Sequence, residues 1–201
     1  MSNIFWIFID GGANITVPDD TFGSNSYMIT QELEGEFHHV HSSAEYKEGT
    51  TTPVMELTAA LRALKFMQEQ KVEKCDIYVV ADALNTVKSY EEWYFGWRRR
   101  AKNGVWKNAD NKTVLNQEII KETVSILEDL KKNNYVKFFH INSHSTKYTV
   151  EQFHLNFMKQ NKVTISLEVF KVLLKFNDMV DKLCTKTRLE GRNIHGKKKL
   201  R

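Results

Sequence analysis

The sequence predicts an α/β domain in which helices flank a mixed five-stranded sheet. Two observations predict this class. Near the N-terminus, three segments of strand length follow one another with polar connections, as in an antiparallel meander. Further along, apolar strand-like runs alternate with segments of helical periodicity. Both patterns together are typical of a layered domain, and 201 residues suffice for one such domain with a substantial core.

The five expected strands are recognised by their apolar residues. The first is "IFWIFI" at 4–9, a continuous apolar run that indicates burial on both faces. The next two lie at 26–32 and 36–42 and are joined by the turn-like "LEGE". The last two are "CDIYVVAD" at 75–82 and "YVKFFHI" at 135–141. A meander of three strands is therefore expected beside two strands that alternate with helices.

The first helix is expected in "TTPVMELTAALRALKFMQEQ", because Thr52 can cap the open amides and Pro53 suits the first helical position. "ALNTVKSYEEWYFGW" after the fourth strand indicates a second helix. A long third helix is expected within 111–132. The pattern from the fourth strand onward is thus strand, helix, helix, strand.

Beyond the fifth strand, two more helices are expected, at 150–162 and 164–184, with Ser166 or Thr164 as the cap of the second. We expect one domain over residues 1–185, followed by a flexible basic tail at 186–201 that ends in "GKKKLR". The tail either adds nonspecific affinity for a polyanion, acts as a nuclear address or only solubilises the chain end.

Composition narrows the setting in which the chain works. The formal net charge is +4, but basic residues cluster in "WRRRAK" and in the tail, which favours a polyanionic partner. The two cysteines lack the spacing of a zinc site or a disulfide framework, which suits a reducing compartment. No apolar run has the length of a membrane span. A cytoplasmic protein is expected, or a nuclear one if the source is eukaryotic.

Three acids, Asp10, Glu56 and Asp82, each follow or interrupt an apolar run. An unpaired buried charge costs several kcal/mol, so each needs compensation by a cap, a turn, a salt bridge or a cation. No matching set of buried Arg or Lys appears near them in the sequence. Clustered carboxylates suit Mg²⁺ or Mn²⁺ rather than zinc, and two such ions about 4 Å apart can drive phosphodiester hydrolysis.

The order of several motifs resembles type 1 ribonuclease H over roughly residues 3–185. The motifs are "FIDGG", "TTPVMELTAALRAL", "VVADALNTV", "WYFGWRRRAKNGVWKNADNKTVLNQE", "INSHST" and "NDMVDKL". "MELTAA" and the basic segment rich in tryptophan are the most specific of these. The resemblance implies a ribonuclease H-like fold and an endonuclease that cleaves the RNA strand of RNA/DNA hybrids, using two Mg²⁺ ions for which Mn²⁺ can substitute.

The resemblance also implies roles for individual residues. The residues that match the family's metal-binding acids are Asp10, Glu56, Asp82 and Asp181. Asp181 is assigned by aligning Asn177 with the asparagine that opens the last motif, and Asp178 then falls where the family tolerates another acid. His144 matches the mobile histidine that helps proton transfer or product release.

Residues 93–107 match the family's basic protrusion, which grips the hybrid. The residues expected to contact nucleic acid are Trp93, Trp97, Arg98, Arg99, Arg100, Lys102, Trp106, Lys107 and Thr51. Cations contact phosphates without reading sequence, so activity without sequence preference is expected. The protein is also expected to be a monomer. We expect mixed roles, with some tryptophans anchoring the protrusion; the alternative is that all the tryptophans are core and the arginines only solubilise them.

The sequence departs from the family pattern at several positions. Thr52 and Pro53 replace the usual asparagines before the helix, and Ala83 replaces a small hydroxyl residue. These changes leave open a catalytically weak hybrid-binding protein of the same fold, and a third reading is a ribonuclease H-like nuclease acting on DNA. His144 and Asp181 are 37 positions apart, more than is usual, so an insertion with an extra helix is expected at 148–165, before the C-terminal helix.

Overall fold

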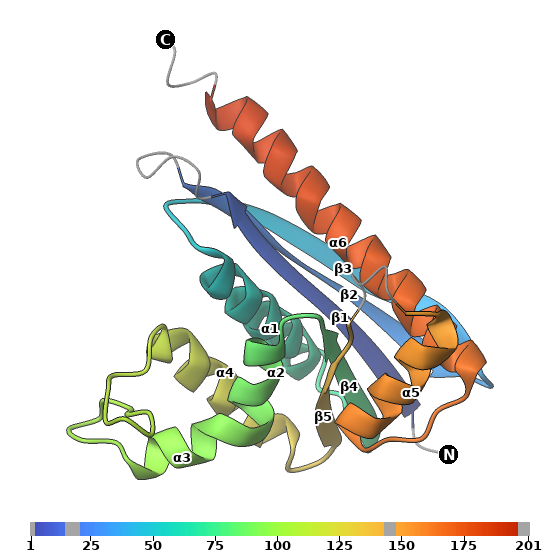
Figure 1. Ribbon diagram of the computed structural model, residues 1–201, viewed down its shortest axis with the longest axis horizontal. Coiled ribbons are helices and arrows are strands. Elements are labelled where there is room, and N and C mark those ends of the chain that lie inside the picture. Colours follow the sequence, from blue (N-terminus) through green and yellow to red (C-terminus); the bar gives the residue numbers. More distant parts are fainter. Residues whose placement is uncertain (1–2, 15–20, 143–147, 197–201) are drawn as a thin grey trace.

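The protein is described as a computed structural model that covers residues 3–14, 21–142 and 148–196 (Figure 1). Its five strands form one mixed sheet in the order β3-β2-β1-β4-β5. β1 pairs antiparallel with β2 and parallel with β4, β2 pairs antiparallel with β3, and β4 pairs parallel with β5. The strand bounds are Asn3–Asn14 for β1, Phe22–Leu33 for β2, Glu36–Glu48 for β3, Cys75–Ala81 for β4 and Tyr135–His140 for β5. The predicted mixed five-stranded sheet is confirmed.

The three meander strands are longer than predicted, because β1 continues through Asp10 and pairs with the polar start of β2. Ser24 and Ser26 of β2 are fully buried. Their hydroxyls donate to the backbone carbonyls of Cys184 and Val180, at 2.6 and 2.9 Å. A polar segment can therefore form a buried strand, since a facing helix accepts its hydrogen bonds.

One face of the sheet is covered by α1 (Thr52–Glu69), α2 (Leu84–Lys88) and α4 (Gln117–Leu130) (Figure 1). Contrary to the prediction, Thr52 does not cap α1. The N-cap residue is Thr51, which makes no side-chain cap bond, and Pro53 lies in the first turn. The Thr52 hydroxyl instead accepts a hydrogen bond from the Ala13 amide of β1, at 3.1 Å. This bond joins the start of α1 to the C-terminal end of β1, which also carries Asp10.

The single helix predicted after β4 has three parts. After α2 comes a π-helical turn, η1 (Ser89–Trp93), and then α3 (Tyr94–Arg99). Tyr90 and Tyr94 are buried in the core, and the Glu91 carboxylate accepts a hydrogen bond from the Phe138 amide of β5 at 2.8 Å. The base of the basic segment is thereby fixed to the sheet.

The other face is covered by α5 (Val150–Asn161) and α6 (Leu167–Gly196) (Figure 1). Ser166 caps α6 as predicted, since its hydroxyl accepts from the Val169 amide at 3.2 Å. The phenylalanines Phe157 and Phe170 join the two helices in a second apolar core with the inner face of β1 and β5. The helix α5 lies within the predicted insertion.

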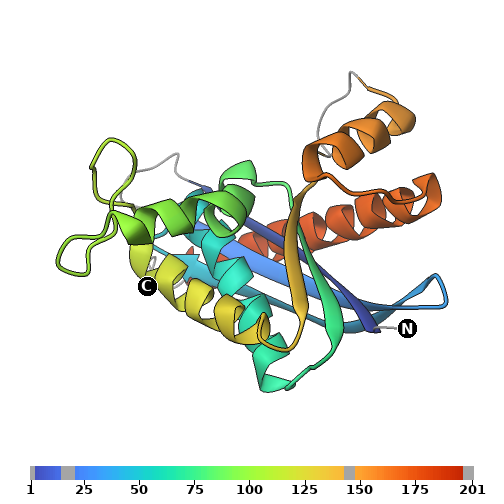
Figure 2. The same cartoon turned by 90° about the horizontal axis from the view of Figure 1, so that it is seen from below.

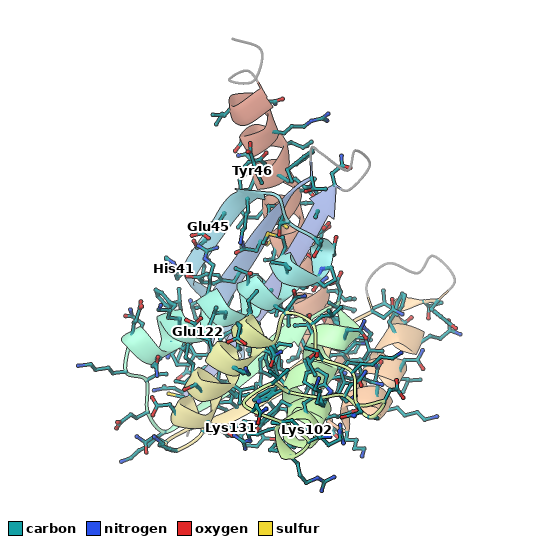
Figure 3. All side chains as sticks on the ribbon, turned by 90° about the vertical axis from the view of Figure 1, so that its left-hand side faces the viewer. His41, Glu45, Tyr46, Lys102, Glu122 and Lys131 are labelled. Carbon is teal, nitrogen blue, oxygen red and sulfur yellow. The ribbon has the colours of Figure 1, made fainter. Side chains whose placement is uncertain are left out.

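Helix α6 runs 30 residues and passes the expected domain end at residue 185. Residues 186–196, which were expected to begin the basic tail, are helical. The extension lies along the long strands (Figure 1). Tyr46 of β3, labelled in Figure 3, lies against Gly191, and the Arg192 guanidinium lies 5.2 Å from the centre of the Phe22 ring. No helix in the described part of the chain, α6 included, is long and apolar enough to cross a membrane.

Gly191→Ala is expected to destabilise the protein by about 1 kcal/mol, although alanine favours helices more than glycine. A Cβ at this position would lie 2.1 Å from the Tyr46 ring, so the helix and β3 must move apart. Thermal unfolding measures the effect, and Glu190→Ala on the exposed side of the same turn is the control. A higher Tm for Gly191→Ala than for the parent would contradict this packing.

Candidate active site

Three carboxylates meet at the end of the two central parallel strands. Asp10 lies in β1, Asp82 follows β4, and Glu56 lies in the first turns of α1. β1 and β4 are parallel neighbours in which Ile9 pairs with Ala81, so the next residue in each strand is an aspartate. One carboxylate oxygen from each of the three acids lies within 4.8 Å of the others. The structure thus brings together the three acids that the sequence predicted.

Gly11 allows α1 to approach β1 closely enough for Glu56 to join the cluster. A Cβ on Gly11 would lie 2.3 Å from the Glu56 backbone nitrogen and 2.4 Å from the Met55 carbonyl carbon. No side chain fits there without displacing the backbone of α1. The first glycine of "DGG" is therefore required by helix packing, which explains why it directly follows the aspartate.

The cluster carries more negative charge than its surroundings neutralise. The pKa of Asp10 is raised to about 6, chiefly by burial and also by the charges of Asp82 and Asp181, against hydrogen bonds from Cys184 and Gly11 that lower it. Burial and the charges of Asp10 and Asp82 hold the pKa of Glu56 well above its usual range. Among the described residues, the Glu56 Oε2 atom is buried without a hydrogen-bond partner. Raised carboxylate pKa values and an unpaired buried oxygen are properties of a site whose negative charge a bound cation would neutralise. All the donors are oxygens, which fits a hard divalent ion.

Metal-free protein is expected to gain stability when Glu56 is replaced by glutamine. The pKa of Asp10 is about 6 in the folded protein against 3.8 for an ordinary aspartate, so the folded state binds more protons between these values. This group's contribution therefore destabilises the fold as the pH rises from about 4 to 6. The pKa of Glu56 is also raised, chiefly by burial and then by the charges of Asp10 and Asp82, so its ionised carboxylate destabilises the metal-free fold in the same direction.

In chelator at pH 7.5, Glu56→Gln should raise Tm by roughly 3 to 6 °C, the shift expected from about 1.5 kcal/mol in a domain of this size. The gain should shrink below pH 5, where protonation already relieves the repulsion. Glu122→Gln on the exposed face of α4 (Figure 3) is the matched control and should leave Tm unchanged. An equal Tm for parent and Glu56→Gln at pH 7.5 would show that the charge of Glu56 does not destabilise the metal-free protein.

The two aspartates of "NDMVDKL" lie in different surroundings on α6. Asp181 is half-buried, and its charge contributes to the raised pKa of Asp10. Asp178 is exposed and forms an ion pair with Lys182, one helical turn further on. The geometry favours Asp181 as the fourth acid, which remains a prediction until its variants are assayed.

The expected mobile histidine, His144, lies outside the described residues. A second histidine, His140 at the end of β5, lies next to the cluster. Its Nδ1 accepts a hydrogen bond from the Gln160 amide at 2.8 Å, so its Nε2 donates to the Asp82 backbone carbonyl at 3.0 Å. His140 thereby fixes the turn that carries Asp82.

Sequence reasoning missed two side chains on the face of α6 that carries Asp181. The first is Cys184, whose buried thiol donates to the Ser24 carbonyl at 3.3 Å and also hydrogen-bonds Asp10. Burial raises the pKa of this thiol to about 12, so it stays neutral. The positions 181, 184 and 188 follow helical spacing, which was the available signal.

Arg188 is the second of these side chains. Its Nη1 lies 2.2 Å from where a Cβ would be on Gly12, so the guanidinium covers this glycine, two residues after Asp10. Its Nη2 donates to the Thr185 hydroxyl at 3.3 Å. A positive charge therefore lies over Gly12, two residues along β1 from Asp10.

The basic segment at 93–107 has a structural base and an exposed tip. Trp106 is buried, Trp97 packs against the same core, and the rings of Trp93 and Trp97 lie 5.7 Å apart. The Arg100 Nε donates to the carbonyls of Lys107 and Asn108, at 3.3 and 3.1 Å. Figure 2 shows this part of the chain projecting away from the sheet.

The cations of the segment differ in their partners. Arg98 pairs with Glu128 at 2.8 Å, and the Lys107 ammonium donates to the Thr113 hydroxyl at 2.9 Å. Arg99 and Lys102 are exposed, and neither side chain has a hydrogen bond or ion pair within the described ranges. Thr51 is also exposed, at the start of α1. Arg99, Lys102 and Thr51 are therefore the predicted contacts that remain accessible to a ligand.

A family model and the curated relatives both show similarity to ribonuclease H. The family model described as RNase H matches residues 2–167. The ribonuclease H of Pelobacter propionicus is 36% identical over 104 residues, which are 52% of this chain and 57% of that protein. The ribonuclease H of Alkalilimnicola ehrlichii is 31% identical over 130 residues, which are 65% of this chain and 79% of that protein. The match thus spans little more than half the length of the first relative.

Solved structures with the same fold are more distant in sequence. LC9-RNase H1, described as a type 1 RNase H with the type 2 active-site motif, gives a TM-score of 0.62 at 10% identity, over 94% of this chain and 73% of that chain. The solution structure of the PFV RNase H domain gives 0.60 at 13% identity, over 94% of both chains. The second similarity includes the region of α6 that extends past the family match, since it covers nearly the whole chain.

Proposed function

The chain belongs to the ribonuclease H family, and we propose that it hydrolyses the RNA strand of RNA/DNA hybrids. Cleavage is proposed to be independent of sequence and to leave a 3′-hydroxyl and a 5′-phosphate. The observation that carries the proposal is the meeting of Asp10, Glu56 and Asp82 within 4.8 Å at the end of the central strands. A foamy viral protease-reverse transcriptase of the same fold, with a TM-score of 0.61 at 14% identity over 93% of this chain and 20% of that chain, was solved with an RNA/DNA hybrid.

Four carboxylates are proposed to hold two divalent cations, with Mg²⁺ as the physiological ion and Mn²⁺ as a substitute. They are Asp10, Glu56, Asp82 and Asp181. Two of them, Asp10 and Glu56, have pKa values raised chiefly by burial, and such costly buried charges give the site its affinity for positive charge. When bound, such ions activate the attacking water and stabilise the leaving oxygen of a phosphodiester.

The other residues of the site act on the substrate. Arg188 is placed to contact a phosphate that approaches the acids, and its position over Gly12 limits its motion. His144 is proposed to assist proton transfer or product release. Arg99 and Lys102, at the tip of the basic protrusion, are proposed to contact phosphates further along the duplex. Hybrid recognition then combines these contacts with the 2′-hydroxyls of one strand.

The proposed catalytic unit is a monomer formed by the whole sheet and its helices. We propose that it includes α6 to its end at Gly196, because the extension packs on β2 and β3. Cys75 and Cys184 are buried free thiols, which supports a reducing compartment such as the cytoplasm.

One assay tests the proposal. Purified protein is incubated with labelled RNA/DNA hybrid, duplex RNA and duplex DNA, with Mg²⁺ and with chelator. Loss of only the hybrid's RNA strand, and only with metal, supports the proposal. Binding of the hybrid without cleavage would instead indicate a hybrid-binding protein whose changes at Thr52, Pro53 and Ala83 have removed activity. Cleavage of duplex DNA would indicate a different substrate for the same fold.

A further inference from the structure

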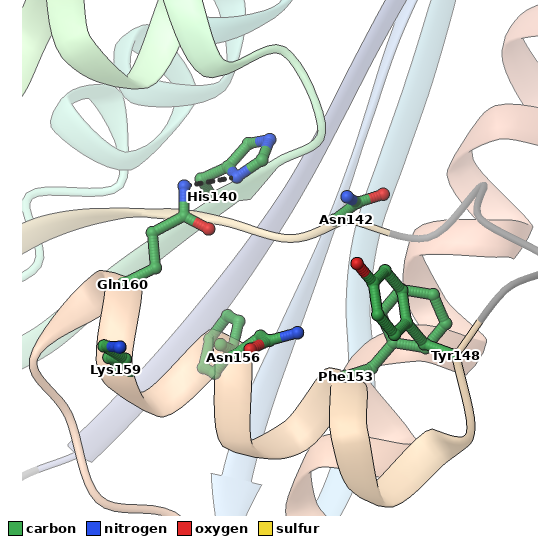
Figure 4. A pocket seen from close by; sticks show the side chains of 8 residues that line it. His140, Asn142, Tyr148, Phe153, Asn156, Lys159 and Gln160 are labelled. Atoms are coloured by element: carbon green, nitrogen blue, oxygen red, sulfur yellow. Dashed lines mark hydrogen bonds between the residues drawn. The ribbon is translucent and has the colours of Figure 1, made fainter.

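A cavity of about 460 Å³ lies between the end of β5 and helix α5 (Figure 4). The His140 ring contacts the Asp82 carbonyl through Nε2 and Gln160 of the cavity wall through Nδ1. Its volume is in the range of sites that bind small ligands. The residues that line it are His140, Asn142, Tyr148, Phe153, Asn156, Phe157, Lys159 and Gln160. Most of these residues belong to the insertion, so the cavity exists because the chain contains α5.

The cavity is formed in advance because α5 is fixed to the end of β5. The Asn161 side chain accepts from the His140 amide at 2.8 Å and donates to the His140 carbonyl at 2.9 Å. Phe157 is buried against Phe139 and Phe170. A capping box between Thr149 and Gln152 begins the helix. The walls are therefore positioned without a ligand, which lowers the entropic cost of binding one.

The lining combines three kinds of group. The Tyr148 ring is 50% exposed and stands edge-on to the Phe153 ring, with centres 5.7 Å apart and planes at 73°. Asn142 and Asn156 are exposed and provide amide donors and acceptors (Figure 4). Lys159 provides a positive charge. An aromatic face, amides that can pair with a base edge and a cation for a phosphate together suit a nucleotide. No carboxylate lines the cavity, which disfavours a metal ion.

The position of the cavity next to the acid cluster suggests which nucleotide it would bind. His140 forms part of its wall and donates from Nε2 to the Asp82 backbone carbonyl at 3.0 Å, so the cavity and the acid cluster share this residue. A base inside a duplex is stacked on both sides and cannot enter, whereas an unpaired base presents a free face and edge. Under the proposed function the strand that the acids engage is the RNA strand, so an unpaired nucleotide beside the acids would belong to that strand.

We propose that this cavity binds one unpaired nucleotide of the RNA strand that flanks the hybrid. The inference rests on the proposed function, because the flank is part of that substrate. The base stacks on Tyr148, the amides of Asn142 and Asn156 pair with its edge, and Lys159 contacts a phosphate. The site favours hybrids whose RNA strand continues past the duplex over hybrids with blunt ends.

The test measures binding by Asp82→Asn protein, which keeps the hybrid intact, to three duplexes of equal length. One hybrid has blunt ends, one carries three unpaired ribonucleotides at each end of the RNA strand, and one carries three unpaired deoxynucleotides at each end of the DNA strand. The RNA overhangs should tighten binding by roughly tenfold, the gain that one stacked base provides. Tyr148→Ala in the same background should abolish the gain and leave blunt-hybrid affinity unchanged. Leu155→Ala, also on exposed surface but outside the cavity, should retain it.

Equal affinity for blunt and RNA-overhang hybrids would overturn the proposal, as would an equal gain in Tyr148→Ala. An equal gain from DNA overhangs would overturn the assignment to RNA. A second measurement separates this inference from the proposed function. Binding of a free RNA trinucleotide, followed by NMR with parent, Tyr148→Ala and Asn156→Ala proteins, does not depend on cleavage. Trinucleotide binding that requires Tyr148, together with failure to cleave any hybrid, would overturn the proposed function and leave the cavity's ligand supported.

Discussion

Asp82→Asn should reduce cleavage of an RNA/DNA hybrid by roughly a thousandfold or more, because it removes one of the carboxylates proposed to hold the cations. The substitution keeps the size of the side chain and removes its charge. The turn that carries Asp82 is held through its backbone carbonyl by His140, so the variant should fold as the parent does. Affinity for the hybrid should change less than threefold, since the phosphate contacts are proposed to come from the basic protrusion and Arg188.

Single-turnover cleavage and fluorescence anisotropy measure the two effects separately. Asp129→Asn is the matched control, because Asp129 is an exposed residue of α4 whose contacts are with Gln68 and Lys132. It should cleave at the parental rate. Near-parental turnover by Asp82→Asn in Mg²⁺ would refute the assignment of this residue to the metal site. Loss of hybrid binding in parallel with activity would instead indicate that Asp82 holds the substrate-binding surface together.

The acid cluster was predictable because each acid interrupts an apolar run, where an uncompensated charge is costly. Its geometry depends on two long-range features that periodicity does not reveal. One is the parallel pairing of Ile9 with Ala81, which brings Asp10 and Asp82 to the same edge. The other is the close approach of α1 to Gly11. The sequence thus indicates which acids form the cluster, but it does not indicate how close their carboxylates lie in the fold.

The polar strand ends and the end of α6 were not predictable for one shared reason. Ser24, which precedes the strand predicted at 26–32, resembles a loop residue, and residues 186–196 resemble a solvated tail. Each segment is ordered by the other side of the same interface: Ser24 donates to the Cys184 carbonyl of α6, and further along the helix Gly191 lies on Tyr46. A polar segment whose hydrogen bonds are made by a partner far away in the sequence carries no local signal of burial.

Asp181→Asn and Asp178→Asn should give opposite results, although the two residues lie one helical turn apart. Asp181 is half-buried and acts electrostatically on Asp10, whereas Asp178 is exposed and paired with Lys182. We expect Asp181→Asn to slow cleavage by roughly a hundredfold, with a partial recovery at high Mg²⁺ because a weakened ligand set lowers metal affinity. Asp178→Asn should stay within twofold of the parent, since an exposed ion pair contributes little. Cleavage rates across a Mg²⁺ titration distinguish the two. If Asp178→Asn is the inactive variant, α6 presents the other aspartate to the metals when substrate is bound, and the register of the last motif must shift by one turn.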